Sequence, residues 1–271
     1  MKTFVPALCL AVLLAGCTQT PPRPAATVSP EARAQLAPGG ALRVAVLTSN
    51  PIIGSRDAKS GELAGTTVML GRALAERAGV PAKMIEYTAV NKLVEDATAG
   101  AWDVTVVAID PARRSVLDFS PAHLSADGFL TVLVPPGSAA RTMADVDRPG
   151  MRIAAVRGAA TAMILERTLK QARVASAENE NAAFALMKEG KAEGYAQNRF
   201  MLRARAETLP GARILDDSFA GLRLAFALPK GRPEAVRFVN AFVEEAKASG
   251  TVQRAIDAAG IGADVRVAPA G

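Results

Sequence analysis

The sequence predicts an α/β protein made of two similar units, each with a parallel sheet covered by helices. Two series of apolar, strand-like runs alternate with amphipathic helical patterns, one over residues 42–109 and one from residue 151 onward. Strands that alternate with helices favour a parallel sheet, because a parallel connection must cross over the sheet and usually does so as a helix. Two longer extended runs, 128–134 and 222–228, are expected to join the two units.

In the first series, the apolar run 42–47 is typical of a buried strand and ends at Ser49-Asn50-Pro51. A helix is expected from about Thr67, and Gly79 followed by Pro81 marks its end. The pattern then predicts a strand, a second helix and a third strand, over residues 83–87, 91–99 and 103–109 respectively.

The second series repeats this order. It predicts strands at 151–156, near 174 and at 193–196, with helices at about 160–169, 182–189 and from 198. Two amphipathic helices close the chain, beginning at Pro233 and near Val252. The first carries one apolar stripe, formed by Ala235, Phe238, Val239, Phe242, Val243 and Ala246. Because their polar faces carry mixed charge, both helices are expected to pack on a core and not on a membrane.

Residues 1–16 predict an export signal, with Lys2 followed by an apolar run that is shorter than the roughly 20 residues a membrane span needs. The ending Leu14-Ala15-Gly16-Cys17 resembles a bacterial lipobox, in which the cysteine is lipidated and becomes the first mature residue. An ordinary signal peptide with a chance cysteine is the alternative. Residues 17–39 are rich in Thr, Pro, Ala and Ser, which predicts a flexible tether behind the lipidated Cys17.

Composition excludes several classes of function. The other cysteine, Cys9, lies inside the predicted signal, so no internal disulfide is expected. His123 is the sole histidine and cannot form a histidine-rich metal site. The chain has no Walker-type loop and no Gly-x-Ser-x-Gly motif, so we predict no cofactor, no metal and no catalytic residues. The net charge of +6 is scattered and only 4% of residues are aromatic, which argues against nucleic-acid binding.

Over residues 41–260 the sequence resembles the extracellular solute-binding proteins of family 3, which supply polar amino acids to ABC importers. The most specific match is Pro111-Ala112-Arg113 followed by Asp118-Phe119-Ser120. Weaker matches are Gly100-Ala101-Trp102-Asp103 and Gly190-Lys191-Ala192-Glu193.

The resemblance implies a type II periplasmic binding protein fold, in which two α/β lobes joined by two crossover strands close around a ligand in the cleft. Lobe one is expected to combine residues 40–133 with 225–271, and lobe two to span 134–224. The implied protein is a monomer in the periplasm or cell envelope, attached to the membrane by its lipid only. Its implied partners are a small-molecule solute and an inner-membrane ABC permease. A non-transport sensor or partner-binding module, or a dehydratase-like enzyme of this fold, is the alternative.

The resemblance also assigns a ligand site. Arg113 stands where the family's arginine clamps the ligand's α-carboxylate, and a guanidinium offers the planar, two-donor fork that this requires. A surface arginine is the alternative interpretation. Asn198 replaces the acid that pairs the ligand's ammonium, while Ala108 and Asp110 stand where the family has hydroxyl or glycine residues.

These departures remove partners for a zwitterion, so the predicted ligand is a small polar or anionic solute, amino-acid-like or a carboxylate. Asp110 is equally compatible with an ammonium partner and with a helix cap, and Arg157 with an anion contact and with a solvated side chain. The residues predicted to bind the ligand are Asn50, Thr66, Ala108, Asp110, Arg113, Arg157, Ala159 and Asn198.

Overall fold

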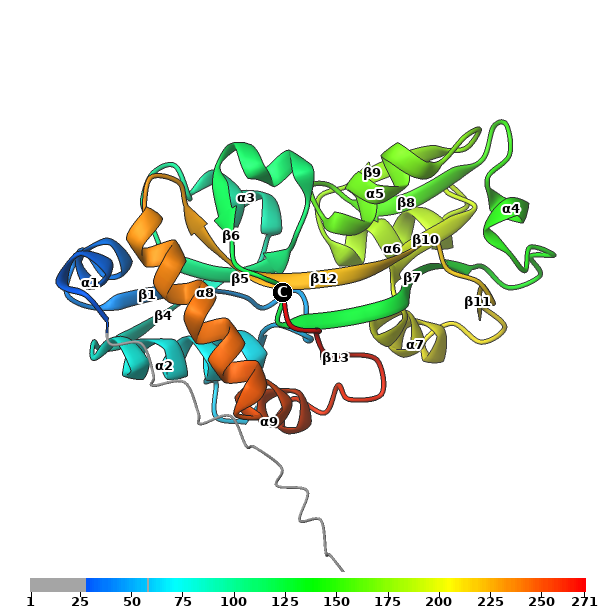
Figure 1. Ribbon diagram of the computed structural model, residues 1–271. Coiled ribbons are helices and arrows are strands. Elements are labelled where there is room, and N and C mark those ends of the chain that lie inside the picture. The colour runs from blue at the N-terminus through cyan, green and yellow to red at the C-terminus, as the bar shows by residue number, and fades with distance from the viewer. Residues whose placement is uncertain (1–27, 58) are drawn as a thin grey trace, which may run out of the picture.

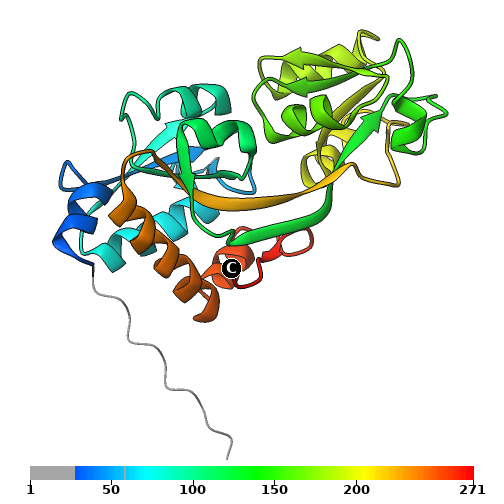
Figure 2. The ribbon, with the colours of Figure 1, turned by 45° about the horizontal axis from the view of Figure 1, so that its top comes forward.

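The computed structural model describes residues 28–57 and 59–271. The predicted signal peptide, Cys17 and residues 18–27 of the predicted tether therefore lie outside the described residues. Figure 1 shows two α/β lobes side by side, with the long strands β7 (Leu124–Val134) and β12 (Ala220–Pro229) running from one to the other. In the turned view of Figure 2, both strands pass along one side of the space between the lobes.

The main sheet is continuous through both lobes, in the order β4-β1-β5-β12-β7-β10-β8-β9. Lobe one contains the parallel strands β4 (Ala82–Tyr87), β1 (Leu42–Leu47) and β5 (Val104–Ala108). Lobe two contains the parallel strands β10 (Gly194–Asn198), β8 (Arg152–Val156) and β9 (Arg173–Ala177). Between them, β12 and β7 pair antiparallel with each other and with their outer neighbours. The lobe boundaries expected at 133/134 and 224/225 fall inside these two strands.

Helices cover both sides of the lobe-one strands. Helices α2 (Thr66–Ala78), α8 (Pro233–Ala248) and α9 (Thr251–Ala258) pack together, and Figure 1 shows α3 (Val90–Glu95) on the opposite side from α2. Gly79 ends α2 in the left-handed conformation, at φ 66°, which a residue without Cβ adopts without strain. All six apolar residues of the predicted α8 stripe are buried, as its spacing predicts.

Lobe two has an apolar layer on each side of its strands. Along β8, Ile153 and Ala155 face a layer formed with α4 (Met143–Val146) and α5 (Ala160–Thr168). The alternate residues Ala154 and Val156 face the other layer, formed with α6 (Glu180–Lys188) and α7 (Arg199–Glu207). This alternation follows from the two-residue period of a strand.

The predicted tether is wrong over residues 30–36, which form helix α1 (Pro30–Leu36). Ser29 caps the helix by accepting a hydrogen bond from the N–H of Ala32, and Pro30 occupies its first turn. Ala32 and Leu36 are one helical turn apart and both are buried, against α8 among other elements. The tether was predicted from the overall composition of residues 17–39, which takes no account of the spacing of Ala32 and Leu36. Two apolar residues one turn apart are enough to dock this short helix on the core.

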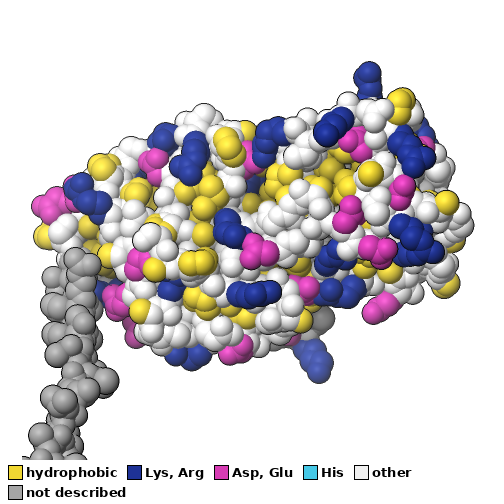
Figure 3. Space-filling model, turned by 45° about the vertical axis from the view of Figure 1, so that its right-hand side comes forward, with side chains coloured by type: hydrophobic (Ala, Val, Ile, Leu, Met, Phe, Trp, Pro, Cys, Tyr) yellow, Lys and Arg dark blue, Asp and Glu magenta, His cyan; other side chains and the backbone are white. Residues whose placement is uncertain are grey.

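The structure also contains short elements that the sequence analysis did not predict. They are helix α4, the 3₁₀ turn Pro111–Ser115 and the strands β2 (Ser55–Arg56), β3 (Leu63–Ala64), β6 (Leu117–Phe119), β11 (Arg213–Ile214) and β13 (Arg266–Val267). Within residues 28–57 and 59–271, no helix combines the length and apolarity that crossing a bilayer requires. Figure 3 shows Lys and Arg side chains interspersed with Asp and Glu over one face, so that face carries no continuous basic patch.

Candidate functional site

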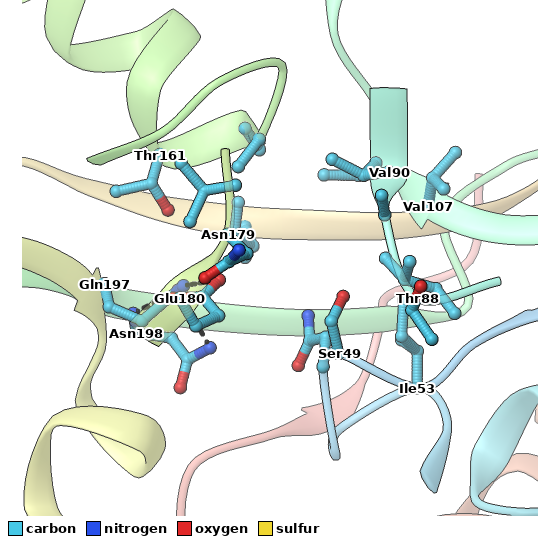
Figure 4. A pocket seen from close by; sticks show the side chains of 18 of the residues that line it. Ser49, Ile53, Thr88, Val90, Val107, Thr161, Asn179, Glu180, Gln197 and Asn198 are labelled. Carbon is cyan, nitrogen blue, oxygen red and sulfur yellow. Dashed lines mark hydrogen bonds between the residues drawn. The ribbon is translucent and has the colours of Figure 1, made fainter. Parts of the chain in front are cut away.

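A cleft of about 700 Å³, including the part open to solvent, lies between the lobes. Lobe one lines it from the carboxyl ends of β1, β4 and β5, and lobe two from the carboxyl ends of β8, β9 and β10. Open parallel sheets bind ligands at this edge, because the connecting loops diverge there and leave a crevice. Figure 4 shows Ser49, Ile53 and Thr88 facing Glu180 and Asn198 across this cleft.

Arg113 is the cation that lines the cleft among the described residues, and only 5% of it is exposed. Its Nη1 donates to the carbonyl of Ala108 at 2.9 Å, which anchors it within lobe one. Its Nη2 donates to the carbonyl of Gly158 in lobe two, also at 2.9 Å. Burial lowers the pKa of Arg113 to about 10, and nearby Asp110 acts in the opposite direction, so the guanidinium stays charged at neutral pH. It retains N–H groups beyond these two bonds with which to bind an anion.

The N-terminus of α5 lies beside this guanidinium. Ala159, Ala160 and Thr161 all line the cleft, and Ala159 provides no side-chain cap for the helix. The first turn of a helix presents backbone N–H groups without intrahelical partners together with the positive end of the helix dipole. Gly158 makes the preceding turn at φ 73°, a conformation that favours glycine, and its carbonyl is the one that Arg113 reaches. This end of the cleft is suited to an anionic group.

A carboxylate lies at another place in the cleft. Glu180 lines it from the first turn of α6 and is half-buried. Gln197 Nε2 donates to Glu180 Oε1 at 2.7 Å, and the Tyr195 hydroxyl donates to Oε2. Gln197 is itself oriented by Asn198, whose backbone N–H donates to Gln197 Oε1 at 2.8 Å. Figure 4 shows Glu180, Gln197 and Asn198 together on the lobe-two wall. Burial raises the pKa of Glu180, and the two hydrogen bonds act against that rise.

Four of the predicted ligand residues besides Arg113 line the cleft, namely Asn50, Ala108, Ala159 and Asn198. Asn198 also has a structural role, because its Oδ1 accepts a hydrogen bond from the N–H of Met201 and caps α7. It is 1% exposed and its Nδ2 donates to Gln197 at 3.2 Å, so it supports its neighbours as well as forming part of the wall.

Asp110 is not part of the cleft wall, contrary to the ligand-binding prediction. The alternative interpretation as a cap describes it correctly, since its Oδ1 accepts from the N–H of Ala112 at 2.9 Å. Its Oδ2 also accepts from Nη2 of Arg167 on α5 at 2.7 Å, with a second contact of 3.4 Å between Nη1 and Oδ1. Asp110 is 1% exposed. Its two carboxylate oxygens are used by the cap and by the ion pair to Arg167 in the other lobe.

Thr66 and Arg157 also lie outside the cleft wall, which corrects their assignment as ligand residues. Thr66 is fully buried at the start of α2, and its hydroxyl donates to the carbonyl of Ile52 at 3.0 Å. Arg157 is exposed, so the alternative interpretation as a solvated side chain describes it. Arg157 was predicted as a ligand residue because it lies just before Ala159 in the sequence, but its side chain does not line the cleft.

The chain matches the family described as bacterial extracellular solute-binding proteins, family 3, over residues 42–258. It belongs to this family. Solved structures with the same arrangement include a mutant of ArgBP from T. maritima, at a TM-score of 0.70 and 22% identity over 84% of this chain and 98% of that one. An amino acid ABC transporter substrate-binding protein from Streptococcus pneumoniae, bound to L-arginine, gives 0.69 and 20% over 84% and 97%. These likenesses confirm the predicted type II periplasmic binding protein fold.

Two further proteins extend the comparison. The ancestral amino acid-binding protein AncCDT-1, described as a precursor of cyclohexadienyl dehydratase, has a TM-score of 0.69 and 23% identity over 83% of this chain and 97% of that one. The virulence sensor protein BvgS of Bordetella bronchiseptica is 27% identical over 186 residues. That match covers 66% of this solute-binding chain and 14% of BvgS, so the chain spans a small part of the sensor's length.

The sequence analysis of this solute-binding protein missed several polar residues of the lobe-two wall. Glu178, Glu180 and Gln197 all line the cleft and all lie at or just after a strand end. Had the carboxyl-end rule been applied to every predicted strand, it would have selected these positions. Within the part of the chain that the structure describes, no group of His, Cys, Asp and Glu side chains is arranged to hold a metal ion.

Proposed function

We propose that this protein captures a small polar solute outside the cytoplasm and delivers it to an inner-membrane ABC permease. Its membership of the family and the cleft between two lobes support this role. The cleft is lined by apolar residues with a few converging polar groups, as small-molecule sites usually are. Similar solved structures include amino acid ABC transporter substrate-binding proteins, which supports a solute of amino-acid size and polarity.

Arg113 carries the proposal. A buried guanidinium that lines the cleft beside an uncapped helix N-terminus is a site for a carboxylate or a similar anion. Because Arg113 belongs to lobe one and α5 to lobe two, an anion bound by both favours the arrangement in which the lobes are together. Ligand binding shifts a conformational equilibrium only through such contacts, which are present in one state and absent in the other.

The test is the substitution Arg113→Ala, with Arg114→Ala as the matched control. A panel of L-amino acids and small carboxylates is first screened by thermal shift, and each ligand found is then titrated by calorimetry. We expect Arg113→Ala to weaken binding about 30-fold or more, since losing one member of a buried charge pair costs roughly 2–5 kcal/mol. Arg114 is exposed, and its guanidinium lies 5.6 Å from the Phe119 ring, so its removal should leave affinity unchanged. Equal affinities for wild type and Arg113→Ala would refute the role of Arg113.

We further propose that Cys17 carries a lipid that anchors the protein, as a monomer, in the cell envelope. The support is the lipobox-like ending of the apolar N-terminal run. Cys17→Ser should move the protein from the membrane pellet to the soluble envelope fraction, with the fold unchanged. Because the exchange removes only the lipidated sulfur, a variant that still sediments with membranes would contradict the anchor.

The proposed role includes no chemical change to the solute, so a bound ligand should be recovered with its mass unaltered after incubation. Sensing is the second candidate, because 66% of the chain resembles part of the sensor BvgS. Uptake separates the two: a strain lacking this gene should lose uptake of the radiolabelled solute if the protein serves transport. A sensor would leave uptake intact and alter gene expression when the solute is added.

A further inference from the structure

The cleft contains an acid, Glu180, that forms no salt bridge with any residue the structure describes. Its ionisable wall residues, among those described, are Arg113, Glu178 and Glu180. Glu178 is exposed, whereas Glu180 is half-buried between α6 and β10. Within the described part of the chain, no lysine or arginine forms a salt bridge with Glu180, although the charge of Arg205 acts on it from farther away. Buried charges in proteins are ordinarily paired, so an unpaired carboxylate in a ligand cleft calls for a counter-ion.

The hydrogen bonds around Glu180 favour its ionised form. Each of its oxygens accepts one hydrogen bond, one from Tyr195 and one from Gln197. Neither bond requires a proton on the carboxyl group. An ionised carboxylate has about four acceptor positions, so roughly two remain for a ligand. Tyr195 is fully buried and Gln197 is 7% exposed, which means that both donors are held in place by the core of lobe two. The carboxylate is therefore oriented before any ligand arrives, and this lowers the entropy lost on binding.

We propose that Glu180 binds a protonated nitrogen of the solute, so that the ligand carries a cationic group as well as the anionic group held by Arg113. This inference rests on the proposed function. It narrows the predicted polar or anionic solute, amino-acid-like or a carboxylate, to one that carries both charges, because Arg157 lies outside the cleft and two carboxylates line it. Asn198 stands where the family resemblance implies an acid that pairs with the ligand's ammonium. In this structure it caps α7 and orients Gln197. The acid that pairs with the cation thus comes from the start of α6.

Matched ligand pairs test this directly. The probes are the standard L-amino acids, the corresponding 2-hydroxy acids, which exchange the α-ammonium for a hydroxyl, and small dicarboxylates without nitrogen. Each is titrated by calorimetry into wild type and into the Glu180→Gln, Glu180→Asp and Glu178→Gln variants. Glu180→Gln keeps the side-chain size and removes the charge. Glu178→Gln removes the charge of the other cleft acid and tests whether Glu178 is the cation partner instead.

We expect an amino acid to bind wild type at least about 30-fold more tightly than its 2-hydroxy acid. Glu180→Gln should lose most of that preference, Glu180→Asp should keep it with weaker binding, and Glu178→Gln should keep the preference as well. The retained preference of Glu180→Asp shows that a loss in Glu180→Gln is not a folding defect, and thermal melts of all three variants check this independently.

Different failures are distinguishable. If dicarboxylates or hydroxy acids bind as well as amino acids, or if Glu180→Gln keeps the full preference, the role of Glu180 is overturned while solute binding stands. If Glu178→Gln loses the preference instead, the cation partner is Glu178 and the inference is again overturned. If no probe in any set binds, the proposed capture of such solutes fails together with the inference.

Discussion

His123 is a buried ionisable residue that the binding site does not use. It is fully buried in lobe one, where its ring lies 5.1 Å from the ring of Phe226. Neither ring nitrogen has a hydrogen-bond partner among the described residues. Burial, with a smaller effect from the charge of Lys247, lowers the pKa of His123 from 6.5 to about 3. The imidazole is therefore neutral in the folded protein at every pH above that value.

This depressed pKa predicts a loss of stability in mild acid. Between pH 6.5 and about 3, the unfolded chain binds a proton at His123 and the folded protein does not. The free energy of unfolding should therefore fall as pH falls through this window, with a contribution from His123 of up to about 1.4 kcal/mol per pH unit. His123→Phe keeps an aromatic ring beside Phe226 and removes the titration. Urea denaturation at pH 7.5, 6.5, 5.5 and 4.5 should give a shallower pH slope for this variant.

The comparison is specific because His123 is the only histidine in the chain. Carboxylates with shifted pKa values titrate in both proteins and cancel in the difference between the two slopes. His123→Leu, which removes the ring as well as the titration, should show the same shallow slope at lower stability. Parallel slopes for wild type and both variants would mean that His123 is not buried as a neutral group.

At the scale of elements, periodicity predicted the helices and strands that bury one continuous apolar face. It missed the short elements that are held by contacts with residues far away in the sequence. The α8 stripe, from Ala235 to Ala246, is visible in the sequence because one continuous face packs on the core. Helix α1 and the two-residue strands were missed because each depends on a distant partner, such as Gln35 Oε1, which accepts from the N–H of Glu234 at 2.8 Å. Local pattern carries no information about such partners.

The same distinction applies to the candidate site. Arg113 was found through a local motif, Pro111-Ala112-Arg113, whose position at the end of a strand follows from the preceding apolar run. Glu180 has no such motif and looks like any acid in the first turn of a helix, where the helix dipole favours it. What distinguishes it is the pair of donors from β10, Tyr195 and Gln197, which lie 15 and 17 residues away. Only the folded sheet brings them together.

At the scale of the whole molecule, polar contacts join the lobes outside any ligand contact, among them an ion pair between Arg203 on α7 and Asp264 after α9. Two others connect the region after β5 to the segment around α5. One is the bond from Arg113 to the carbonyl of Gly158, and the other is the ion pair between Asp110 and Arg167. Asp110 is almost fully buried while 48% of the Arg167 side chain is exposed, so solvent screens the pair from one side. Separating the lobes would break both contacts.

The Asp110–Arg167 ion pair predicts that lobe separation depends on residues that do not touch the solute. Removing it with Arg167→Ala should destabilise the joined arrangement by about 1 kcal/mol, which corresponds to about fivefold in the open-to-closed ratio. Asp110→Asn should have a similar effect while still capping the 3₁₀ turn through its side-chain oxygen, and the double variant should add little to either single one. The control is Arg157→Ala, which removes an exposed arginine of the same lobe that lies outside the cleft.

Small-angle X-ray scattering of the ligand-free mature protein measures this directly through the radius of gyration. Arg167→Ala and Asp110→Asn should both increase the radius over wild type, and Arg157→Ala should not. Raising the salt concentration should expand wild type toward the two variants, because the pair is half-exposed and therefore screened. Identical radii at every salt concentration would show that the Asp110–Arg167 pair does not control lobe separation. Closure would then depend on the other contacts between the lobes, which include those of Arg113 and Arg203, and on the bound solute.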